Sequence, residues 1–363
     1  MDMSDTAHMP PYSVLDLAMV KTGSSIANSF AETLDLAQHA ERWGYKRFWL
    51  AEHHNMAGVA SAATAVLIGH VAGGTSEIRV GSGGVMLPNH APLVIAEQFG
   101  TLETLYPGRI DLGLGRAPGT DGPTLRALRR RPESADDFPE QVEELLGLLE
   151  PSRPGQIVRA VPGAGTRVPV WLLGSSTFSA QLAAQLGLPF AFAAHFAPQL
   201  MRQALHLYRT AFRPSQWLEK PYALVCIPML AAETDAEAEV LSTTVKLKFL
   251  DIIRGTKDSL IRPAVASMAG LWSQQEEYMV HTMLGELIAG SPRTVELQLA
   301  ELIASTRVDE IMISCTAYDQ AARLRSYELV SEVLRGIGRG ADGWERQTPR
   351  PNSPMPRDTA ISF

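Results

Sequence analysis

Two adjacent histidines, His53 and His54, follow Glu52 directly after a short apolar segment. Residues 46–50 (KRFWL) have the character of a buried strand, and residues 51–54 (AEHH) lie where that strand would end. Barrel enzymes place functional side chains at such strand ends, and histidine is suited to acid–base chemistry near neutral pH. The segment indicates a site of proton transfer, and a hydrogen-bonded loop corner is the alternative that these residues leave open.

Side-chain directions limit how the two histidines can act. Because successive side chains of a strand point to opposite faces, at most one of His53 and His54 would face a site if the strand included both. The segment carries no HxH or HxxxH spacing and no third ligand nearby in the sequence, so a metal site is not expected here. His90 and His195 also follow strand-like runs, and either of them could face the same site.

Three glycines interrupt another strand-like run. Gly81, Gly83 and Gly84 stand in the segment 81–88 (GSGGVMLP), with Ser82 after the first of them. Glycine weakens the interior of a strand unless a bulge or a closely approaching ligand requires the missing side chain. The run therefore indicates either a flat ligand lying against the backbone or a bulge in the strand.

Two later segments are suited to an anion. Arg116 lies in residues 113–119 (GLGRAPG), which do not form a dinucleotide fingerprint because the spacing differs and Pro118 interrupts the expected helix. Its forked guanidinium suits a phosphate. A second group with backbone N–H donors and hydroxyls precedes a helix expected at 178–186, and it consists of Gly174, Ser175, Ser176 and Thr177. It predicts an anion site at a helix N-terminus or a plain helix cap.

Eight strand-like runs alternate with helical patterns and would position these residues. The runs are 13–20, 47–51, 78–87, 109–114, 168–173, 190–194, 223–230 and 310–314. Several are continuously apolar, as expected of parallel strands that are covered on both sides. Eight such strands favour a (β/α)8 TIM barrel, with a doubly wound open sheet as the competitor. The helix before the histidines is predicted to start at a capping box of Ser29 and Glu32 and to stop at Gly44.

Composition narrows the class of protein. The chain has 363 residues, is 45% hydrophobic and carries a net charge of −7, which argues against a nucleic-acid partner. We interpret the triplet 129–131 (RRR) as a solvated helix end. Cys226 and Cys315 lie in strand-like segments and are expected to be core residues. No window of 18 uninterrupted apolar residues and no secretory leader is present, so we expect a cytoplasmic protein with no membrane partner.

Three segments organise the chain. Residues 1–11 are expected to form an N-terminal arm, residues 12–335 the barrel, and residues 336–363, which include four prolines, a mobile tail. Loop insertions are expected at the C-terminal face. One of them, 255–278, is predicted to be either a lid or a pair of ordinary helices.

Four motifs together resemble the bacterial luciferase-like flavin monooxygenase family, and most closely its single-chain luciferase-like oxidoreductases. They are the tetrapeptide 51–54, the glycine run 81–88, YPGRIDLGLGR at 106–116 and GSP at 290–292. The resemblance implies a (β/α)8 barrel that binds reduced FMN at its C-terminal face. Gly115 stands where light-emitting members have a cysteine, so efficient light emission is not expected.

The resemblance also implies roles for individual residues. His53 matches the catalytic histidine beside the flavin, and Glu52 and His54 match its flanking neighbours. Gly83 and Gly84 match the site of a non-prolyl cis peptide beneath the flavin ring, with Ser82 just before them. The phosphate would be held by Arg116 and by the loop that consists of Gly174, Ser175, Ser176 and Thr177.

The implied activity is that of a two-component FMN-dependent monooxygenase. A separate flavin reductase would supply reduced FMN, O2 would be the co-substrate, and a flavin C4a-hydroperoxide would oxygenate a small organic substrate. A deazaflavin (F420)-dependent hydride-transfer oxidoreductase and a non-catalytic flavin-binding protein are the alternatives. The resemblance further implies a homodimer through helices at 62–72 and 93–105, which otherwise would only cover the barrel.

Overall fold

Eight parallel strands close into a barrel in the computed structural model, which describes residues 9–117, 121–256 and 259–344. The strands are β1 (Tyr12–Asp16), β2 (Arg47–Leu50), β3 (Arg79–Met86), β4 (Ile110–Gly115), β5 (Val170–Gly174), β6 (Phe190–Ala193), β7 (Ala223–Ala231) and β9 (Glu310–Ser314). Each pairs with its neighbour from β1 to β7, and β9 pairs with both β7 and β1. The predicted (β/α)8 barrel is confirmed.

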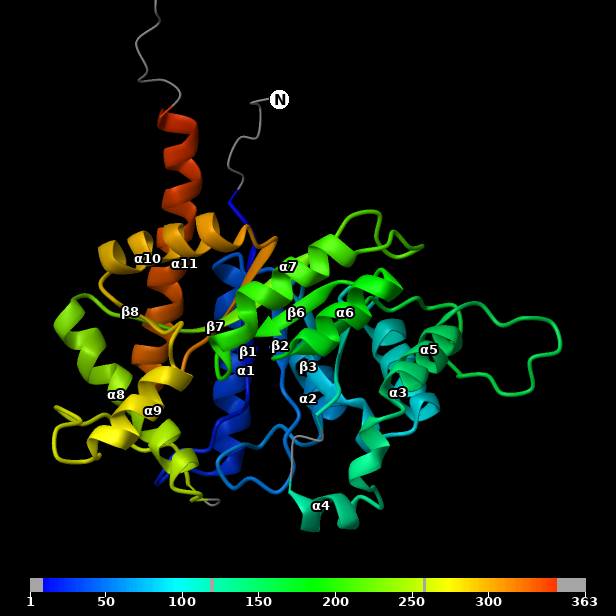
Figure 1. The fold of residues 1–363 in the computed structure, drawn as a ribbon, viewed down its shortest axis with the longest axis horizontal. Coiled ribbons are helices and arrows are strands. Elements are labelled where there is room, and N and C mark those ends of the chain that lie inside the picture. The colour runs from blue at the N-terminus through cyan, green and yellow to red at the C-terminus, as the bar shows by residue number, and fades with distance from the viewer. Residues whose placement is uncertain (1–8, 118–120, 257–258, 345–363) are drawn as a thin grey trace, which may run out of the picture.

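Helices connect the strands and cover the outside of the barrel (Figure 1). They are α1 (Ile26–Arg42), α2 (Thr64–Gly73), α3 (Pro92–Leu105), α4 (Gly122–Ala127), α5 (Phe138–Leu149), α6 (Thr177–Leu186), α7 (Met201–Ala211), α8 (Asp235–Ile253), α9 (Gln274–Met283), α10 (Pro292–Thr306) and α11 (Gln320–Trp344). Three single turns of 3-10 helix, at 87–89, 132–135 and 198–200, complete the elements. None of the helices in the described residues combines the length and apolar character needed to cross a membrane.

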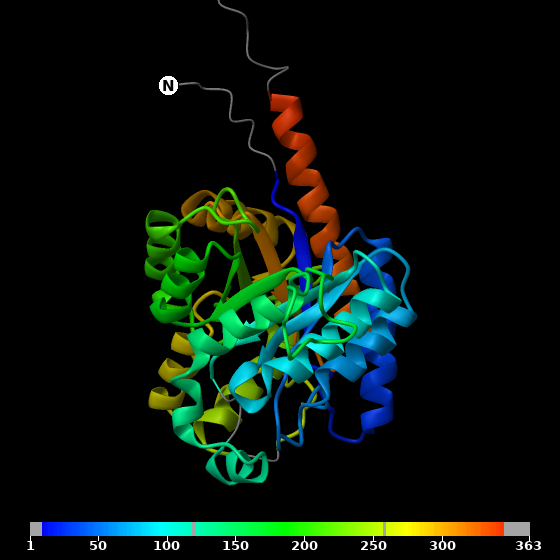
Figure 2. The ribbon, with the colours of Figure 1, turned by 90° about the vertical axis from the view of Figure 1, so that its right-hand side faces the viewer.

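The two ends of the barrel have different roles. Figures 1 and 2 both show α4 and the pair α8–α9 at one end, and the start of β1 and the far end of α11 at the other. The first is the end at which the parallel strands finish, so the insertions gather at the C-terminal face, as predicted. In TIM-barrel enzymes this face carries the active site.

One strand was missed in the sequence, and one helix start was misplaced. β8 (Ile288–Gly290) pairs with Met229–Ala231, the part of β7 that continues beyond its ladder with β9; three residues are too short to give a periodic signal. The predicted capping box is wrong: α1 starts earlier, at Ser25, whose side chain accepts a hydrogen bond from the Asn28 N–H. Ser29 is buried inside the helix instead. The helix does stop before Gly44, which has a φ of +79°.

The boundaries of the outer segments also differ from expectation. α11 continues to Trp344, past the expected boundary at 335, and the rest of the predicted tail lies outside the described residues. Segment 255–278 is not a pair of helices: an irregular stretch leads into α9, and its Met268 is buried against α8. Both cysteines are buried and free, as predicted.

Charged groups close the amino-terminal end of the barrel. Arg47 lies between two fully buried carboxylates, 2.7 Å from Asp111 Oδ2 and 2.9 Å from Glu310 Oε1. Its guanidinium also lies over the Trp171 ring, 4.7 Å from the centroid, and Trp49 donates a hydrogen bond to Asp111. Burial disfavours a charged arginine, but the two carboxylates outweigh it and hold the pKa of Arg47 above its usual value. Arg79 adds a second guanidinium, 2.6 Å from Asp111 Oδ1. The interior at this end therefore holds a network in which two arginines balance two carboxylates.

Candidate active site

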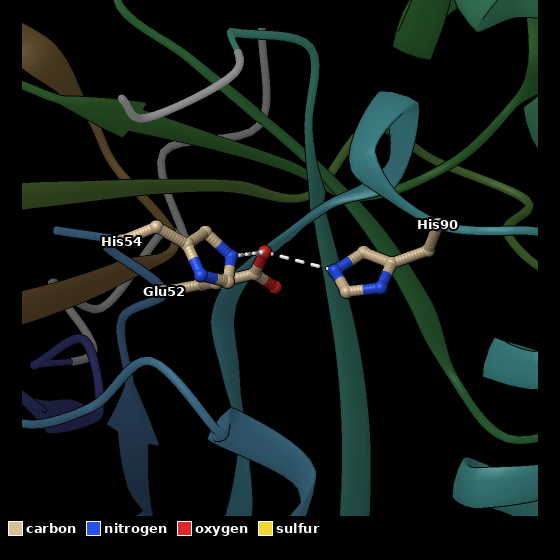
Figure 3. A group of neighbouring side chains, drawn as sticks. All are labelled: Glu52, His54 and His90. Carbon is tan, nitrogen blue, oxygen red and sulfur yellow. Dashed lines mark hydrogen bonds and ion pairs between the residues drawn. The ribbon is translucent and has the colours of Figure 1, made fainter. Parts of the chain in front are cut away.

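Glu52 is the centre of a hydrogen-bonded cluster just beyond the end of β2. Its Oε1 accepts hydrogen bonds from His54 Nε2 and His90 Nε2, each at 2.8 Å, and its Oε2 accepts one from the Met86 N–H at 3.2 Å. Figure 3 shows the carboxylate between the two imidazole rings. The carboxylate therefore fixes the orientation of one histidine from the loop after β2 and of another from the loop after β3.

The cluster keeps its carboxylate ionised. Burial alone would raise the pKa of Glu52, but the hydrogen bonds and charges of His54 and His90 outweigh it and lower the pKa to about 2. Because Glu52 is 1% exposed, the two imidazoles, rather than water, supply most of the stabilisation of this charge.

His90 is a third possible metal ligand close to Glu52 and His54. It lies 38 residues after Glu52 in the sequence, yet the fold brings it close enough for the ligand atoms of Glu52, His54 and His90 to lie within 4.8 Å of one another. Sequence spacing thus did not reveal that a third possible ligand lies near Glu52 and His54 in space. Both Nε2 atoms point at one carboxylate oxygen (Figure 3), which is the geometry of two donors sharing an acceptor, and we assign no metal to it.

His53 lies in the wall of a cavity that it shares with His54. This cavity of about 370 Å3 lies at the C-terminal face, and its walls include Met56, Val59, Ile252 and Ile261. Because β2 ends at Leu50, the alternation rule for strands does not apply to the two histidines. Both histidines reach the cavity, and the His54 ring is in addition held by Glu52.

His195 is a further histidine near the C-terminal ends of the strands. It follows β6, and its Nδ1 is buried without a hydrogen-bond partner among the described residues. Burial lowers the pKa of His195 to about 3, with further contributions from the charges of Lys248 and His53. The His195 ring is therefore a neutral polar group near His53 at neutral pH.

The glycine run contains the cis peptide that the resemblance implied, between Gly83 and Gly84. The register of β3 against β4 shifts between Ser82 and Val85, so the run does contain an irregularity. A Cβ on Gly84 would lie 2.7 Å from the Gly113 carbonyl oxygen. The close approach of the two strands thus requires glycine at this position.

Ser82 links the glycine run to the neighbouring strand β4. It is fully buried, and its hydroxyl donates to the Gly113 carbonyl at 2.8 Å and accepts from the Gly113 N–H at 2.9 Å. Gly83, by contrast, is partly exposed, and its backbone is accessible to a flat ligand.

The predicted anion-binding residues also come together. The Arg116 guanidinium lies over the ring of Phe178, 4.1 Å from its centroid, and Phe178 is in the first turn of α6. Ser176 is the N-cap of that helix and makes no side-chain cap hydrogen bond, so the first N–H groups of α6 are not capped by it. Arg116, Ser175, Ser176 and Thr177 thus form a cluster at the C-terminal face whose cationic and N–H donors suit an anion.

These features fit the flavin that the resemblance implies. A partly exposed glycine backbone can lie against a ring system, and the cluster of Arg116 and the α6 N-terminus suits its phosphate. Gly174 ends β5, where a Cβ would lie 2.5 Å from Ser179 Oγ. Its role is thus to let β5 turn closely into α6.

Several polar residues of the cavity were missed in the sequence, among them Asp121 and one cation. Lys248 of α8 lines the cavity together with His53. The signal available was a lysine within the largely apolar run 245–250 (VKLKFL). That signal is ambiguous because Lys246 shares the run, and only the fold shows that Lys246 pairs with Glu239 outside the cavity.

Comparison with known proteins by sequence identifies the same family that the motifs resemble. The profile of the family described as luciferase-like monooxygenase matches residues 12–310. A relative from Escherichia coli (strain K12) named luciferase-like monooxygenase is 54% identical over 89% of this chain and 96% of its own. The N-acetyl-S-alkylcysteine monooxygenase of Bacillus subtilis (strain 168) is 32% identical over 89% of this chain and 97% of its own.

Solved structures share the architecture. The crystal structure of apo-MsnO8 superimposes with a TM-score of 0.80 at 37% identity, covering 90% of this chain and 98% of the other. The oxygenating constituent of 3,6-diketocamphane monooxygenase from Pseudomonas putida, in complex with FMN, has a TM-score of 0.69 at 18% identity over 90% of this chain and 98% of its own. The latter likeness concerns the fold alone. The chain belongs to the luciferase-like monooxygenase family of flavin-dependent oxidoreductases.

Proposed function

We propose that this protein is the oxygenating component of a two-component FMN-dependent monooxygenase. The observation that carries the proposal is the placement of His53, the Gly83–Gly84 backbone and the Arg116 cluster at the same end of one barrel. The balanced reaction takes an organic substrate, O2 and reduced FMN to the oxygenated substrate, water and oxidised FMN. The reduced FMN would come from a separate reductase.

The residues of the chain divide the work of binding. Arg116 and the N-H groups at the start of α6 would hold the FMN phosphate, and the partly exposed backbone at Gly83 would lie against the ring system. Reduced FMN supplies the electrons that activate O2, through the flavin C4a-hydroperoxide that the family resemblance implies. The apolar walls of the cavity would keep water away from the reacting atoms.

His53 would control a proton at the reacting atoms. It lines the cavity beside apolar side chains, and its imidazole can give or take a proton near neutral pH. His54 and His90 are held by Glu52, so they would position the loops after β2 and β3 and not move a proton themselves.

Rapid mixing tests the proposal directly. Protein loaded anaerobically with reduced FMN should show, on meeting O2, a slowly decaying flavin hydroperoxide spectrum. His53→Ala should bind reduced FMN as before but lose product formation, and the exposed His206→Ala on α7 serves as the matched control. Reoxidation at the rate seen in buffer would overturn the proposal, and binding of the deazaflavin F420 would then be measured. Wild-type turnover would exclude a merely flavin-binding protein.

The first substrates to test follow from one relative. Because the N-acetyl-S-alkylcysteine monooxygenase spans nearly the same length at 32% identity, we propose N-acetyl-S-alkylcysteines as the starting panel. Product analysis by mass spectrometry would show a gain of one oxygen atom.

We also propose that a second copy of the chain covers α2 and α3. Their outer surface carries apolar side chains that are unusually exposed, including Val66 at 72%, Leu105 at 63% and Val94 at 43%. Apolar surface gathered on neighbouring helices is typical of a subunit interface. Light scattering of the wild-type chain and of Val66→Asp should give a dimer and a monomer, respectively; a monomeric wild-type chain would refute it.

A further inference from the structure

Lys248 presents an ammonium group to the cavity beside His53. It lies on α8, is partly buried, and has Val59, Ile252 and Ile261 as apolar neighbours in the cavity wall. The carboxylate of Asp121 also lines this cavity but is not paired with Lys248. A lysine whose ammonium enters such a space loses much of its hydration. The structure should therefore provide an acceptor for it.

No carboxylate in the described residues provides that acceptor. Lys248 Nζ lies 3.5 Å from the thioether sulfur of Met19, which is a weak acceptor. No acidic oxygen of the described chain lies within ion-pair distance of Lys248, whereas Lys246, two residues earlier on the same helix, is 2.6 Å from Glu239. The two lysines therefore differ in whether the protein itself neutralises them.

Asp16 is the carboxylate whose charge acts most on Lys248, but it is already paired with Arg323. Asp16 is fully buried, and its Oδ1 accepts from Arg323 at 2.7 Å and from the Leu17 N–H at 2.9 Å, while its Oδ2 accepts from Thr33 at 2.6 Å. Arg323 adds a second positive charge on the same side. Asp16 thus balances Arg323 and leaves Lys248 uncompensated.

The charge balance around Lys248 is therefore incomplete. Burial lowers the pKa of Lys248 to about 8, with a further contribution from Arg323 that Asp16 opposes. At neutral pH the group still carries its proton for most of the time. An anion entering the cavity would restore both the missing hydrogen-bond acceptor and the missing negative charge.

The missing anion is not explained by the phosphate of the cofactor. The anion-binding cluster of Arg116 and the α6 N-terminus follows β4 and β5, whereas Lys248 follows β7. Neither Arg116 nor Ser176 is among the described residues that line the cavity with Lys248. The two cationic groups thus serve different ligands.

We propose that Lys248 binds the carboxylate of the organic substrate, and that the substrate combines one carboxylate with a small apolar body. The apolar walls would hold the body of the ligand beside His53 while Lys248 holds its charged end. The volume of about 370 Å3 lies within the range of about 300–1,000 Å3 that is usual for small-ligand sites. Calling this ligand the substrate rests on the proposed monooxygenase function.

Calorimetric titration tests the assignment without turnover. The probes are straight-chain carboxylates of four to ten carbons, arylacetates and the primary alcohols of matching length, added to the chain loaded with oxidised FMN. We expect carboxylates to bind at least tenfold more tightly than the alcohols. Lys248→Met should remove that preference and leave alcohol binding unchanged, Lys248→Arg should retain most of it, and Lys246→Met, the matched control, should behave as wild type.

A pH series separates a charge contact from a packing role. Carboxylate affinity of the wild-type chain should fall between pH 7 and pH 9.5 as Lys248 loses its proton, and affinity of Lys248→Met should stay flat. The other titratable or charged groups around the cavity are Asp16, Arg323, His53, His54, His195 and Asp121. Histidine side chains ordinarily titrate at about pH 6.5, at the lower edge of this interval, and Lys248→Met, which keeps all of these groups, controls for them.

The outcomes keep the two proposals distinguishable. A failure of every carboxylate to bind, an equal affinity for carboxylates and alcohols, or a preference that survives in Lys248→Met would each overturn the role of Lys248. If the preference depends on Lys248 but the rapid-mixing experiment shows no oxygen chemistry, the anion site stands and the monooxygenase proposal falls.

Discussion

Replacing Glu52 by glutamine should destabilise the protein by an amount that depends on pH. The carboxylate accepts hydrogen bonds from two imidazoles at one oxygen and from the Met86 N–H at the other. Glutamine has one acceptor oxygen and one donor nitrogen, so in either orientation a donor would face a donor. The variant therefore loses the charge and at least one of the three hydrogen bonds.

The size of the effect follows from the pKa of Glu52. Lowering the pKa from 4.5 to about 2 corresponds to about 3 kcal/mol of stability at pH 7, at about 1.4 kcal/mol per pH unit. A folded chain of about 330 residues has an unfolding entropy of about 0.7 kcal/mol/K, so the melting temperature should fall by about 4 °C.

The sign of the pH dependence is fixed by the direction of the shift. A folded-state pKa below the unfolded value stabilises the protein fully above pH 4.5, and this contribution is lost as the pH falls towards 2. The difference between wild type and Glu52→Gln should shrink from about 3 kcal/mol at pH 7 to about 2.5 kcal/mol at pH 4 and about 1.4 kcal/mol at pH 3.

Calorimetric melting at matched scan rates would measure this difference. Glu301→Gln, at an exposed position of α10, controls for removal of a negative charge as such and should shift the melting temperature by less than about 1 °C. A difference that is absent at pH 7, or that grows as the pH falls, would refute the view that the two histidines stabilise an ionised Glu52.

Two further substitutions test other parts of the structure. Arg116→Met should weaken FMN binding by about 10- to 100-fold, because one charge-assisted contact is lost. A fluorescence titration would measure this, with Arg126→Met at an exposed position of α4 as the unchanged control. Equal affinities of wild type and Arg116→Met would exclude Arg116 from the phosphate site. Arg47→Met should cost about 3 kcal/mol in urea denaturation at pH 7, because the buried Asp111 and Glu310 would lose the guanidinium between them and keep only Arg79 and Lys46 as cationic partners. A cost below about 1 kcal/mol, the size typical of an exposed ion pair, would contradict the charge argument.

Much of the barrel could be predicted because its signals are local and repeated. All eight barrel strands fall on apolar runs, and the helix stop at Gly44 follows from a residue that adopts positive φ. β8 could not be found because it is defined by pairing with the far end of β7 and not by its own pattern. The capping residue of α1 was misplaced because Ser24, Ser25 and Ser29 all offer a hydroxyl near the start of the helix.

The site was predictable at strand ends and not beyond them. Glu52, His53 and His54 follow β2 directly, so their place at the C-terminal face follows from the strand itself. The link from Glu52 to His90 requires the distance between two loops, which sequence spacing does not contain. Lys248 lies in the helix after β7, and whether a helical lysine points at a cavity or at Glu239 depends on helix rotation, which a mixed run of apolar and cationic residues leaves undetermined.

The charge network at the amino-terminal end has a consequence for kinetics. Arg47, Asp111 and Glu310, packed with Trp49 and Trp171, separate that end of the barrel interior from the cavity beside His53, so ligands of this cavity should enter and leave through the opposite mouth. A single entrance makes the order of arrival matter, since whichever ligand lies deepest must bind first and depart last. Steady-state kinetics of this protein should therefore follow an ordered sequence, with the cofactor as the leading reactant.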